Sequence, residues 1–234
     1  MNEQNNEIDL LEDLYGRIIP KYEEAHGIMA ALLDFPASSD LCFVDLGCGF
    51  GGLTKRILES FPSSTIFCVD SDELILQRMK QKLAAHADQI VPLARNLNDQ
   101  AWMQDIRPPA AILSSFTLDF LTSERRQALL IEAFQLLEPG GRWVSCEFYR
   151  SPDARVNRVF YDLEIRFIRQ ALEQGEVTTD QLDRLSASNR LRHNQPMMTV
   201  DDMKLQLQAA GFSSIDVPWR FLNLAMVSGI KASR

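Results

Sequence analysis

The feature that most constrains the fold of this chain is a glycine-rich loop between an apolar run and a helical segment. The loop follows the strand-like run Leu41–Leu46, reads Gly-Cys-Gly-Phe-Gly-Gly over residues 47–52, and precedes a helix expected over Leu53–Ser60. Glycines let the backbone approach a ligand closely, and the first turn of a helix offers unpaired N–H groups. A strand that ends in such a loop and opens a helix is typical of the ligand site in an α/β protein.

Spacing within the loop suggests a nucleotide-like ligand. Gly47, Gly49 and Gly52 have the spacing G-x-G-x-x-G, which makes a dinucleotide the first ligand to consider. Asp70 ends the next strand-like run, at the place where an acid accepts hydrogen bonds from ribose hydroxyls. These features do not separate NAD from S-adenosylmethionine, because both ligands carry an adenosine ribose. A tight strand-to-helix turn without a ligand is the remaining alternative.

Asp45, two residues before the first glycine, discriminates between the two ligands. The methionyl end of S-adenosylmethionine carries an ammonium and a sulfonium, which a carboxylate attracts, whereas a carboxylate repels a pyrophosphate. The run Asp-Leu-Gly-Cys-Gly-Phe-Gly resembles motif I of the class I S-adenosylmethionine-dependent methyltransferases. The Asp45 carboxylate can also brace the loop through backbone N–H groups, and the two roles are compatible.

Composition limits the class of protein. The chain has 234 residues, 46% of them hydrophobic, and a formal net charge of −8, which suits one α/β domain over residues 1–234 and makes direct nucleic-acid binding unexpected. The four cysteines include no C-x-x-C pair and the three histidines are scattered, so we expect neither a metal site nor a disulfide framework. No hydrophobic signal core and no membrane-spanning run is present, so we expect a cytoplasmic protein without membrane contact.

Strand-like and helix-like segments alternate as far as residue 148, which predicts a mostly parallel, Rossmann-like sheet with helices on both faces. Further strands are expected over Thr65–Asp70, Ile90–Leu93, Ala110–Ser115, Arg142–Phe148, Ile215–Val217 and Leu222–Ile230, which makes seven strands in all. Intervening helices are expected over Glu73–His86, from Thr122 or Ser123 to Leu137, and from Thr199 to Ala210.

Two helical segments stand outside this alternation. Residues 1–38 form an expected N-terminal helical cap, interrupted at Pro20. Residues 151–198 form a helical insertion after the fifth strand, with helices over about Asp153–Gln174 and Thr179–Asn189. Arginines in this insertion are matched by nearly as many acids, which favours a salt-bridged solvated face over an anion-binding patch. Its helices also offer a surface through which two copies of the chain could form a homodimer.

Later motifs extend the resemblance to class I methyltransferases. The turn Leu-Leu-Glu-Pro-Gly-Gly-Arg over residues 136–142 resembles the family's proline–glycine–glycine turn before the fifth strand. Ala-Gly-Phe over residues 210–212 resembles the end of the family's last helix, after which the final two strands form an antiparallel hairpin.

A closer resemblance is to the carboxy-S-adenosylmethionine synthases, which have the same fold. It is carried by Pro20-Lys21-Tyr22 and by residues 115–121, 124–130 and 153–156. Those enzymes convert S-adenosylmethionine and prephenate into a carboxylated cofactor used in tRNA wobble-uridine modification.

The resemblance implies cofactor-binding roles for ten residues. Tyr22 would close over the cofactor, and Asp45 would precede the loop in which Gly47, Cys48 and Gly49 present backbone to the methionyl part. Asp70 and Ser71 would contact the ribose, Asn96 and Leu97 would lie at the adenine edge, and Ser115 would replace an asparagine of the family after the fourth strand. An asparagine in place of the family's aspartate at the adenine edge can still hydrogen-bond the base.

One departure bears on the form of the cofactor. Gln206 stands where the family has an arginine that grips the extra carboxylate. A neutral amide cannot form a charged bidentate pair, and losing such a contact in a desolvated site costs roughly 2–5 kcal/mol. Unless Lys204, Arg192 or Arg220 compensates, the resemblance implies ordinary S-adenosylmethionine, with S-adenosylhomocysteine as product, rather than the carboxylated form.

We therefore expect an S-adenosylmethionine-dependent methyltransferase that acts on a small molecule. The chain lacks an Asp/Asn-Pro-Pro-Tyr loop after the fourth strand, which argues against methylation of a nucleobase amine. Tyr149 and Gln206 are the candidate substrate contacts, and no catalytic base is assigned among Asp119, Glu147, Tyr149, His26 and His193. The alternatives are a carboxy-S-adenosylmethionine synthase, a non-catalytic cofactor-binding module and an NAD-dependent oxidoreductase.

Overall fold

The computed structural model describes residues 14–183 and 197–233 of the chain. Its seven strands are β1 (Cys42–Leu46), β2 (Thr65–Asp70), β3 (Ile90–Ala94), β4 (Ala111–Ser115), β5 (Arg142–Phe148), β6 (Ser213–Phe221) and β7 (Leu224–Ile230). They form one sheet in the order β3-β2-β1-β4-β5-β7-β6, in which only β7 runs antiparallel to its neighbours β5 and β6. The prediction of a seven-stranded Rossmann-like sheet with a terminal antiparallel hairpin is confirmed.

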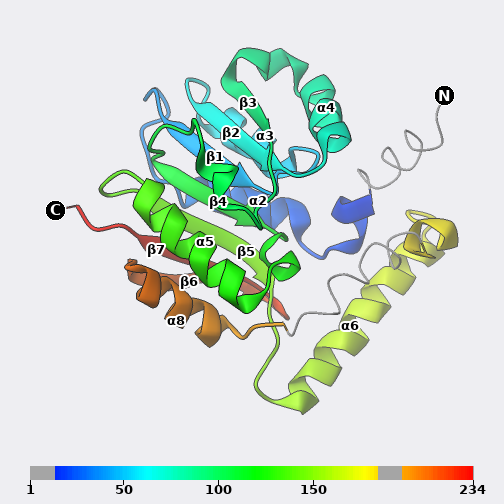
Figure 1. The fold of residues 1–234 in the computed structure, drawn as a ribbon. Helices are drawn as coiled ribbons and strands as arrows, with labels where there is room; N and C mark the ends of the chain where they lie inside the picture. Colours follow the sequence, from blue (N-terminus) through cyan, green and yellow to red (C-terminus); the bar gives the residue numbers. More distant parts are fainter. Residues whose placement is uncertain (1–13, 184–196, 234) are drawn as a thin grey trace.

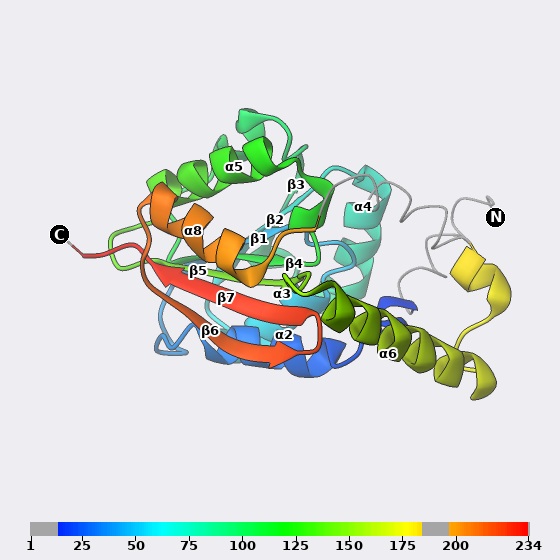
Figure 2. The same ribbon diagram turned by 90° about the horizontal axis from the view of Figure 1, so that it is seen from below.

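Helices cover both faces of this sheet (Figures 1 and 2). The α-helices are α2 (Tyr22–Ala31), α3 (Gly52–Ser60), α4 (Glu73–Lys82), α5 (Ser123–Leu136), α6 (Ala154–Glu173) and α8 (Val200–Ala210). Three short 3₁₀ helices are η1 (Ala84–Gln89), η2 (Gln100–Met103) and η3 (Leu118–Phe120). In Figure 2 the helices α5 and α8 lie on one side of the sheet and α2 lies on the other.

Each face of the sheet has its own apolar core, because successive residues of a strand point to opposite faces. Val44 and Ile112 pack with α5 and α8 in one cluster, whereas Phe43 and Leu113 pack with α2, α3 and α4 in the other. The five residues of β1 are all buried, as a central parallel strand covered on both faces requires.

Helix starts follow the local chemistry of the sequence. The Asp72 side chain accepts hydrogen bonds from the first turn of α4, and the Thr122 side chain does the same for α5. Thr199 and Asp202 form a reciprocal capping box at the start of α8, and Gly211 ends that helix with a φ of 109°. These caps explain why the predicted and observed starts of these helices agree.

Two predicted elements differ from the structure by more than two residues at one end. The helix expected over Glu73–His86 ends at Lys82, because the backbone of Leu83 leaves helical geometry and continues as η1. The strand expected over Ile215–Val217 extends over Ser213–Phe221 as the edge strand β6. Register shifts against β7 interrupt its pairing, and an edge position also tolerates Pro218 within the strand.

The helical insertion leaves the body of the molecule as α6, a long helix of which only Ala171 is buried (Figure 1). The predicted second helix of the insertion is helical over residues 179–183, and its remainder lies outside the described residues. The break expected at Pro20 is observed, since α2 starts after Lys21, whose φ is 63°. In the described parts of the chain, no helix is long and apolar enough to cross a membrane.

The strand order reverses direction at β1, which has β2 on one side and β4 on the other. At such a switch point the connections leave β1 and β4 toward opposite faces, so the carboxyl ends of the strands face an open crevice. The glycine-rich loop after β1 and the segment after β4 both start at this edge. The fold therefore directs attention to the carboxyl ends of β1, β2 and β4.

Candidate functional site

The glycine-rich loop is held tightly against the segment after β4. Gly47, Gly49 and Gly51 have φ values of 67°, 52° and 80°, in the left-handed region that favours glycine. A Cβ atom on Gly47 would overlap the side chain of Thr117, whose hydroxyl donates to the Gly47 carbonyl at 3.3 Å. The Gly47 N–H also donates to the Val69 carbonyl at 2.8 Å. Glycine at position 47 is therefore required by both conformation and space.

Asp70 braces the same loop from the end of β2. One carboxylate oxygen accepts a hydrogen bond from the Gly49 N–H at 3.0 Å, and the other accepts from the Asp72 N–H at 3.1 Å. Burial raises the pKa of the Asp70 carboxyl, and these backbone hydrogen bonds oppose that rise. Asp70 thus ties the loop to β2 and also lines the cavity described below.

Asp45, inside β1, is 1% exposed and accepts a 2.6 Å hydrogen bond from the Thr54 hydroxyl of α3. Burial raises the pKa of its carboxyl to about 7; the Thr54 hydrogen bond opposes this rise and the nearby Asp70 charge adds to it. This hydrogen bond braces Asp45 through a side chain of α3 rather than through loop N–H groups. A cation beside this carboxyl would favour its ionised form.

Aromatic side chains of α2 and of the segment after β4 form another part of the site. The Tyr22 ring lies 4.2 Å from the His26 ring and stacks 5.7 Å from the Phe116 ring, measured between centroids. The His26 Nε2 lies 2.8 Å from the Ser115 hydroxyl oxygen. Burial lowers the pKa of the His26 imidazole to about 4, so the ring is uncharged at neutral pH.

The adenine edge expected at Asn96 and Leu97 follows β3. The Asn96 side-chain oxygen accepts hydrogen bonds from the backbone N–H of Asn98 at 2.9 Å and from its side-chain amide at 3.1 Å. The Leu97 carbonyl accepts from the Arg125 guanidinium at 2.6 Å. This turn therefore has a defined backbone, held locally by Asn96 and from α5 by Arg125.

These groups surround one cavity of about 530 Å³ at the carboxyl ends of β1, β2 and β4. All ten residues that the sequence assigns to cofactor binding line it: Tyr22, Asp45, Gly47, Cys48, Gly49, Asp70, Ser71, Asn96, Leu97 and Ser115. A cavity of this volume is in the usual range for a small ligand or cofactor.

Sequence reasoning missed Phe116 and Thr117, which also line the cavity. Their position directly after Ser115 was the available signal, because residues that follow neighbouring parallel strands meet at one edge of the sheet. The backbone N–H of Thr117 donates to Glu147 at 2.9 Å, which fixes the segment from behind. Glu147 itself is fully buried and does not line the cavity.

The two candidate substrate contacts, Tyr149 and Gln206, do not line this cavity. Tyr149 is fully buried and is not a lining residue of the cavity. Gln206 lies between α8 and α5, where its side-chain oxygen accepts from Arg126 at 3.2 Å and its amide donates to Ser123 at 3.4 Å. Gln206 therefore packs against α5 and is absent from the described lining of the cavity.

The candidate catalytic bases also differ in whether they line the cavity. Among the described residues His26 lines the cavity, Asp119 does not, and His193 lies outside the described residues. No group of three or more histidine, cysteine or acidic side chains in the described ranges could hold a metal ion. All four cysteines are buried thiols.

Comparison with known proteins agrees with this geometry. Residues 43–141 match the methyltransferase domain family. The carboxy-S-adenosyl-L-methionine synthase of Actinobacillus succinogenes is 27% identical over 232 residues, which cover 97% of this chain and 91% of that protein.

Solved structures show the same fold. One of them is magnesium protoporphyrin IX methyltransferase from Synechocystis PCC 6803 with bound S-adenosylmethionine, which has a TM-score of 0.60 and 14% sequence identity. The matched region covers 93% of the present chain and 83% of that protein. An O-methyltransferase family protein from Burkholderia thailandensis has a TM-score of 0.63 at 12% identity and covers 88% of this chain. The present chain spans 55% of the length of that protein.

Residues 43–141 form a methyltransferase domain, and the sheet order and the glycine-rich loop after β1 are those of the class I S-adenosylmethionine-dependent methyltransferase fold. The donor set fits that cofactor: a carboxylate beside the loop suits a cationic methionyl group, and Asp70 suits ribose hydroxyls. Among known families, the chain stands near the carboxy-S-adenosylmethionine synthases, which it resembles along nearly its whole length.

Proposed function

We propose that this protein transfers the methyl group of S-adenosylmethionine to a small-molecule acceptor. The observation that carries the proposal is the convergence of the ten cofactor residues on one cavity, which the aromatic side chains of Tyr22 and Phe116 extend. When bound, the cofactor supplies a methyl group on a sulfonium, whose thioether is an excellent leaving group. The protein then has to position the two reactants and exclude water.

The residues of the cavity divide this work. Asp70 accepts hydrogen bonds from the ribose, and the loop at Gly47 and Gly49 presents backbone to the methionyl part. Asp45 supplies the negative charge that a methionyl ammonium favours. The His26 ring adds no positive charge at neutral pH, because burial holds its pKa near 4, so it does not repel a sulfonium.

The charge of the cavity supports a neutral or cationic acceptor. Its described acidic lining residues are Glu23, Asp45, Asp70 and Asp72, and its described basic lining residues are Lys82 and Arg95. Arg95 is already engaged, since its guanidinium donates to the Trp102 carbonyl at 3.1 Å and pairs with Asp105 at 3.2 Å. An anionic acceptor would approach these carboxylates at an electrostatic cost.

A second candidate function is that of a carboxy-S-adenosylmethionine synthase. It is favoured by the similarity to such enzymes over 97% of this chain. Prephenate, the co-substrate implied by the resemblance, is a dianion, so the acidic side chains that line the cavity would repel it as they would an anionic acceptor. This charge argument, rather than the residue at position 206, is our reason for preferring methyl transfer.

Native mass spectrometry of the purified protein tests both candidates. We expect ordinary S-adenosylmethionine or S-adenosylhomocysteine to co-purify, and S-adenosylhomocysteine to form when an acceptor panel of neutral and cationic small molecules is supplied. A carboxylated cofactor, formed on addition of prephenate, would establish the second candidate instead. Tight cofactor binding without turnover on either arm would make the protein a cofactor-binding module, and preferential NAD binding would overturn the cofactor assignment.

A further inference from the structure

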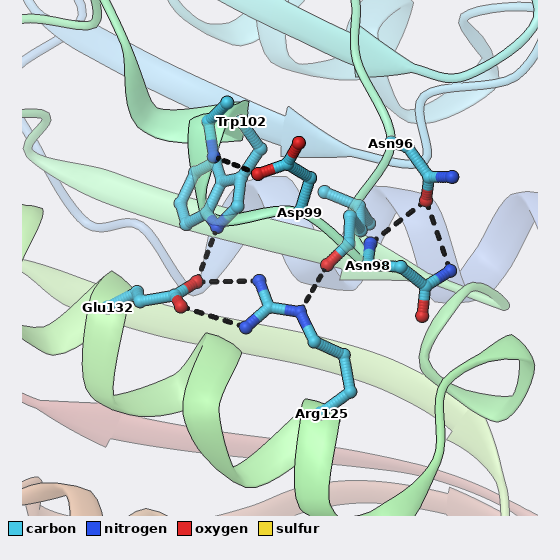
Figure 3. Close-up of polar contacts among 8 residues, drawn as sticks. Asn96, Asn98, Asp99, Trp102, Arg125 and Glu132 are labelled. Carbon is cyan, nitrogen blue, oxygen red and sulfur yellow. Dashed lines mark hydrogen bonds and ion pairs between the residues drawn. The ribbon is translucent and has the colours of Figure 1, made fainter.

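Behind the adenine edge, a set of charged contacts joins α5 to the segment after β3 (Figure 3). The Arg125 Nε donates to the Leu97 carbonyl at 2.6 Å. Its two terminal nitrogens donate to the two carboxylate oxygens of Glu132, at 2.8 Å and 2.7 Å. The Arg125 and Glu132 side chains are only 14% and 9% exposed. All three kinds of donor nitrogen on this guanidinium are therefore used.

Trp102 completes the set. Its indole N–H donates to Glu132 at 2.7 Å, and the side chain is fully buried. Glu132 thus holds the guanidinium in one orientation, and Trp102 holds the carboxylate that does so. A bidentate pair of this kind has a fixed planar geometry, which a flexible single contact lacks.

The consequence falls on one peptide unit, the bond between Leu97 and Asn98. Its carbonyl is taken by Arg125, and its N–H is taken by the Asn96 side-chain oxygen at 2.9 Å. With both polar groups bonded, the peptide plane has a defined orientation. Leu97 is part of this peptide and lines the cavity. Arg125, Glu132 and Trp102 are absent from the described lining residues, so they act on the cavity through Leu97.

We propose that Arg125 is a positioning residue for adenosine: through the Leu97 carbonyl it sets the backbone that faces the base. The proposal rests on the proposed function in one respect, that the cavity takes an adenosine-bearing ligand. It assigns to a charged pair on α5 a role in cofactor affinity that is separate from its role in stability.

The test uses calorimetric binding of S-adenosylhomocysteine and of 5′-methylthioadenosine to the full chain. The double variant Arg125→Met/Glu132→Met removes both charges together, so that neither is left buried without its partner. We expect both ligands to bind roughly tenfold to a hundredfold more weakly, because each ligand must then order the Leu97–Asn98 peptide that Arg125 otherwise holds. The same factor for both ligands is expected because they share the adenosine.

The matched control is Lys55→Met/Glu59→Met, which removes an ion pair of α3 whose side chains are 54% and 43% exposed and do not line the cavity. The contacts of Leu97 remain, so affinity should stay within about twofold of the wild type. Thermal unfolding of each variant separates stability from affinity. If the double variant does not fold, Arg125→Lys replaces it, because an ammonium lacks the fork geometry needed to serve Leu97 and both oxygens of Glu132.

Three outcomes overturn the proposal. Wild-type affinity in the double variant, or in Arg125→Lys, shows that the Leu97 contact does not position the base. An equal loss in Lys55→Met/Glu59→Met shows that the effect does not arise from the contact with Leu97. Failure of the wild-type protein to bind either adenosine-bearing ligand removes the proposed function as well, which distinguishes that failure from the first two.

Discussion

Two walls of the cavity use opposite chemistry. The carboxylate wall, Asp45 and Asp70, stands at the ends of β1 and β2, and both side chains accept hydrogen bonds within the protein. The aromatic wall, Tyr22, His26 and Phe116, packs ring against ring from α2 and the segment after β4. Burial favours the uncharged form of every titratable group on both walls, so it raises the carboxyl pKa values and lowers that of the imidazole.

The two walls therefore respond differently to an arriving cation. With a pKa near 7, Asp45 is partly protonated at neutral pH, and an arriving cation favours loss of that proton. The aromatic wall stays neutral and leaves the charge balance to the carboxylates. Variants on each wall should therefore give distinct signatures.

The largest effect is expected from Asp70→Ala on the carboxylate wall. The change removes the acceptor for ribose hydroxyls and also the brace on the Gly49 N–H. Two hydrogen bonds to a charged group together contribute roughly 3–6 kcal/mol, so affinity for S-adenosylhomocysteine should fall by about a hundredfold or more. Calorimetry checks this, with exposed Asp88→Ala as the control that removes an acid outside the cavity. Affinity within tenfold of the wild type would contradict the assignment.

Asp45→Asn should weaken cofactor binding, and it should increase the stability of the protein relative to the wild type as pH rises. The folded state holds the Asp45 proton more tightly than the unfolded chain, so its ionisation removes stability as pH rises from about 4 to about 7. The amide escapes this penalty of about 4 kcal/mol at most, while still accepting from Thr54. Urea unfolding at about pH 5 and about pH 8 should show the variant gaining on the wild type at the higher pH. An unchanged difference between the two pH values would refute the shifted pKa.

His26→Leu on the aromatic wall should give the opposite slope. The folded state binds the His26 proton more weakly than the unfolded chain, so this residue adds stability as pH rises from about 4 to about 6.5. The leucine variant should lose up to about 3 kcal/mol of that gain, measured as the difference in unfolding free energy across this window. His86→Leu, on η1 outside the cavity, is the matched control.

Ser115→Ala should have the smallest effect. It breaks the 2.8 Å contact with His26 Nε2, and a single neutral hydrogen bond contributes about 1 kcal/mol to stability. Affinity for S-adenosylhomocysteine should change by less than about fivefold, since the aromatic packing remains. A fall in turnover far beyond the change in affinity would instead make Ser115 a catalytic residue.

The cofactor side of the cavity was predictable from the sequence because its residues sit at strand ends. Asp45 and Asp70 belong to the neighbouring parallel strands β1 and β2, and Gly47 directly follows β1. Their local spacing already implies the edge of the sheet at which they meet. Residues that meet through packing were not predictable in this way. His26 and Ser115 are 89 positions apart, and nothing local joins a helix before the sheet to the end of β4.

Gln206 illustrates the limit most clearly. Its alignment with an arginine that contacts ligand suggested a place in the cavity, but the packing of α8 against α5 turns it toward Arg126. The position of a residue in the sequence of a helix determines on which face of the helix it lies. Whether that face points toward a cavity depends on how the helix packs against its neighbour. The same is true of Arg125, which reaches Leu97 across 28 positions of sequence.

Local chemistry thus determined the class of protein: the glycine spacing, the acids at strand ends and the alternation of strands and helices depend only on short-range backbone geometry. Tertiary packing decided what surrounds the cavity, which carboxyl groups are buried enough to shift their pKa, and which guanidinium holds the adenine edge. Burial and long-range hydrogen bonds depend on the whole fold, and no window of sequence contains them.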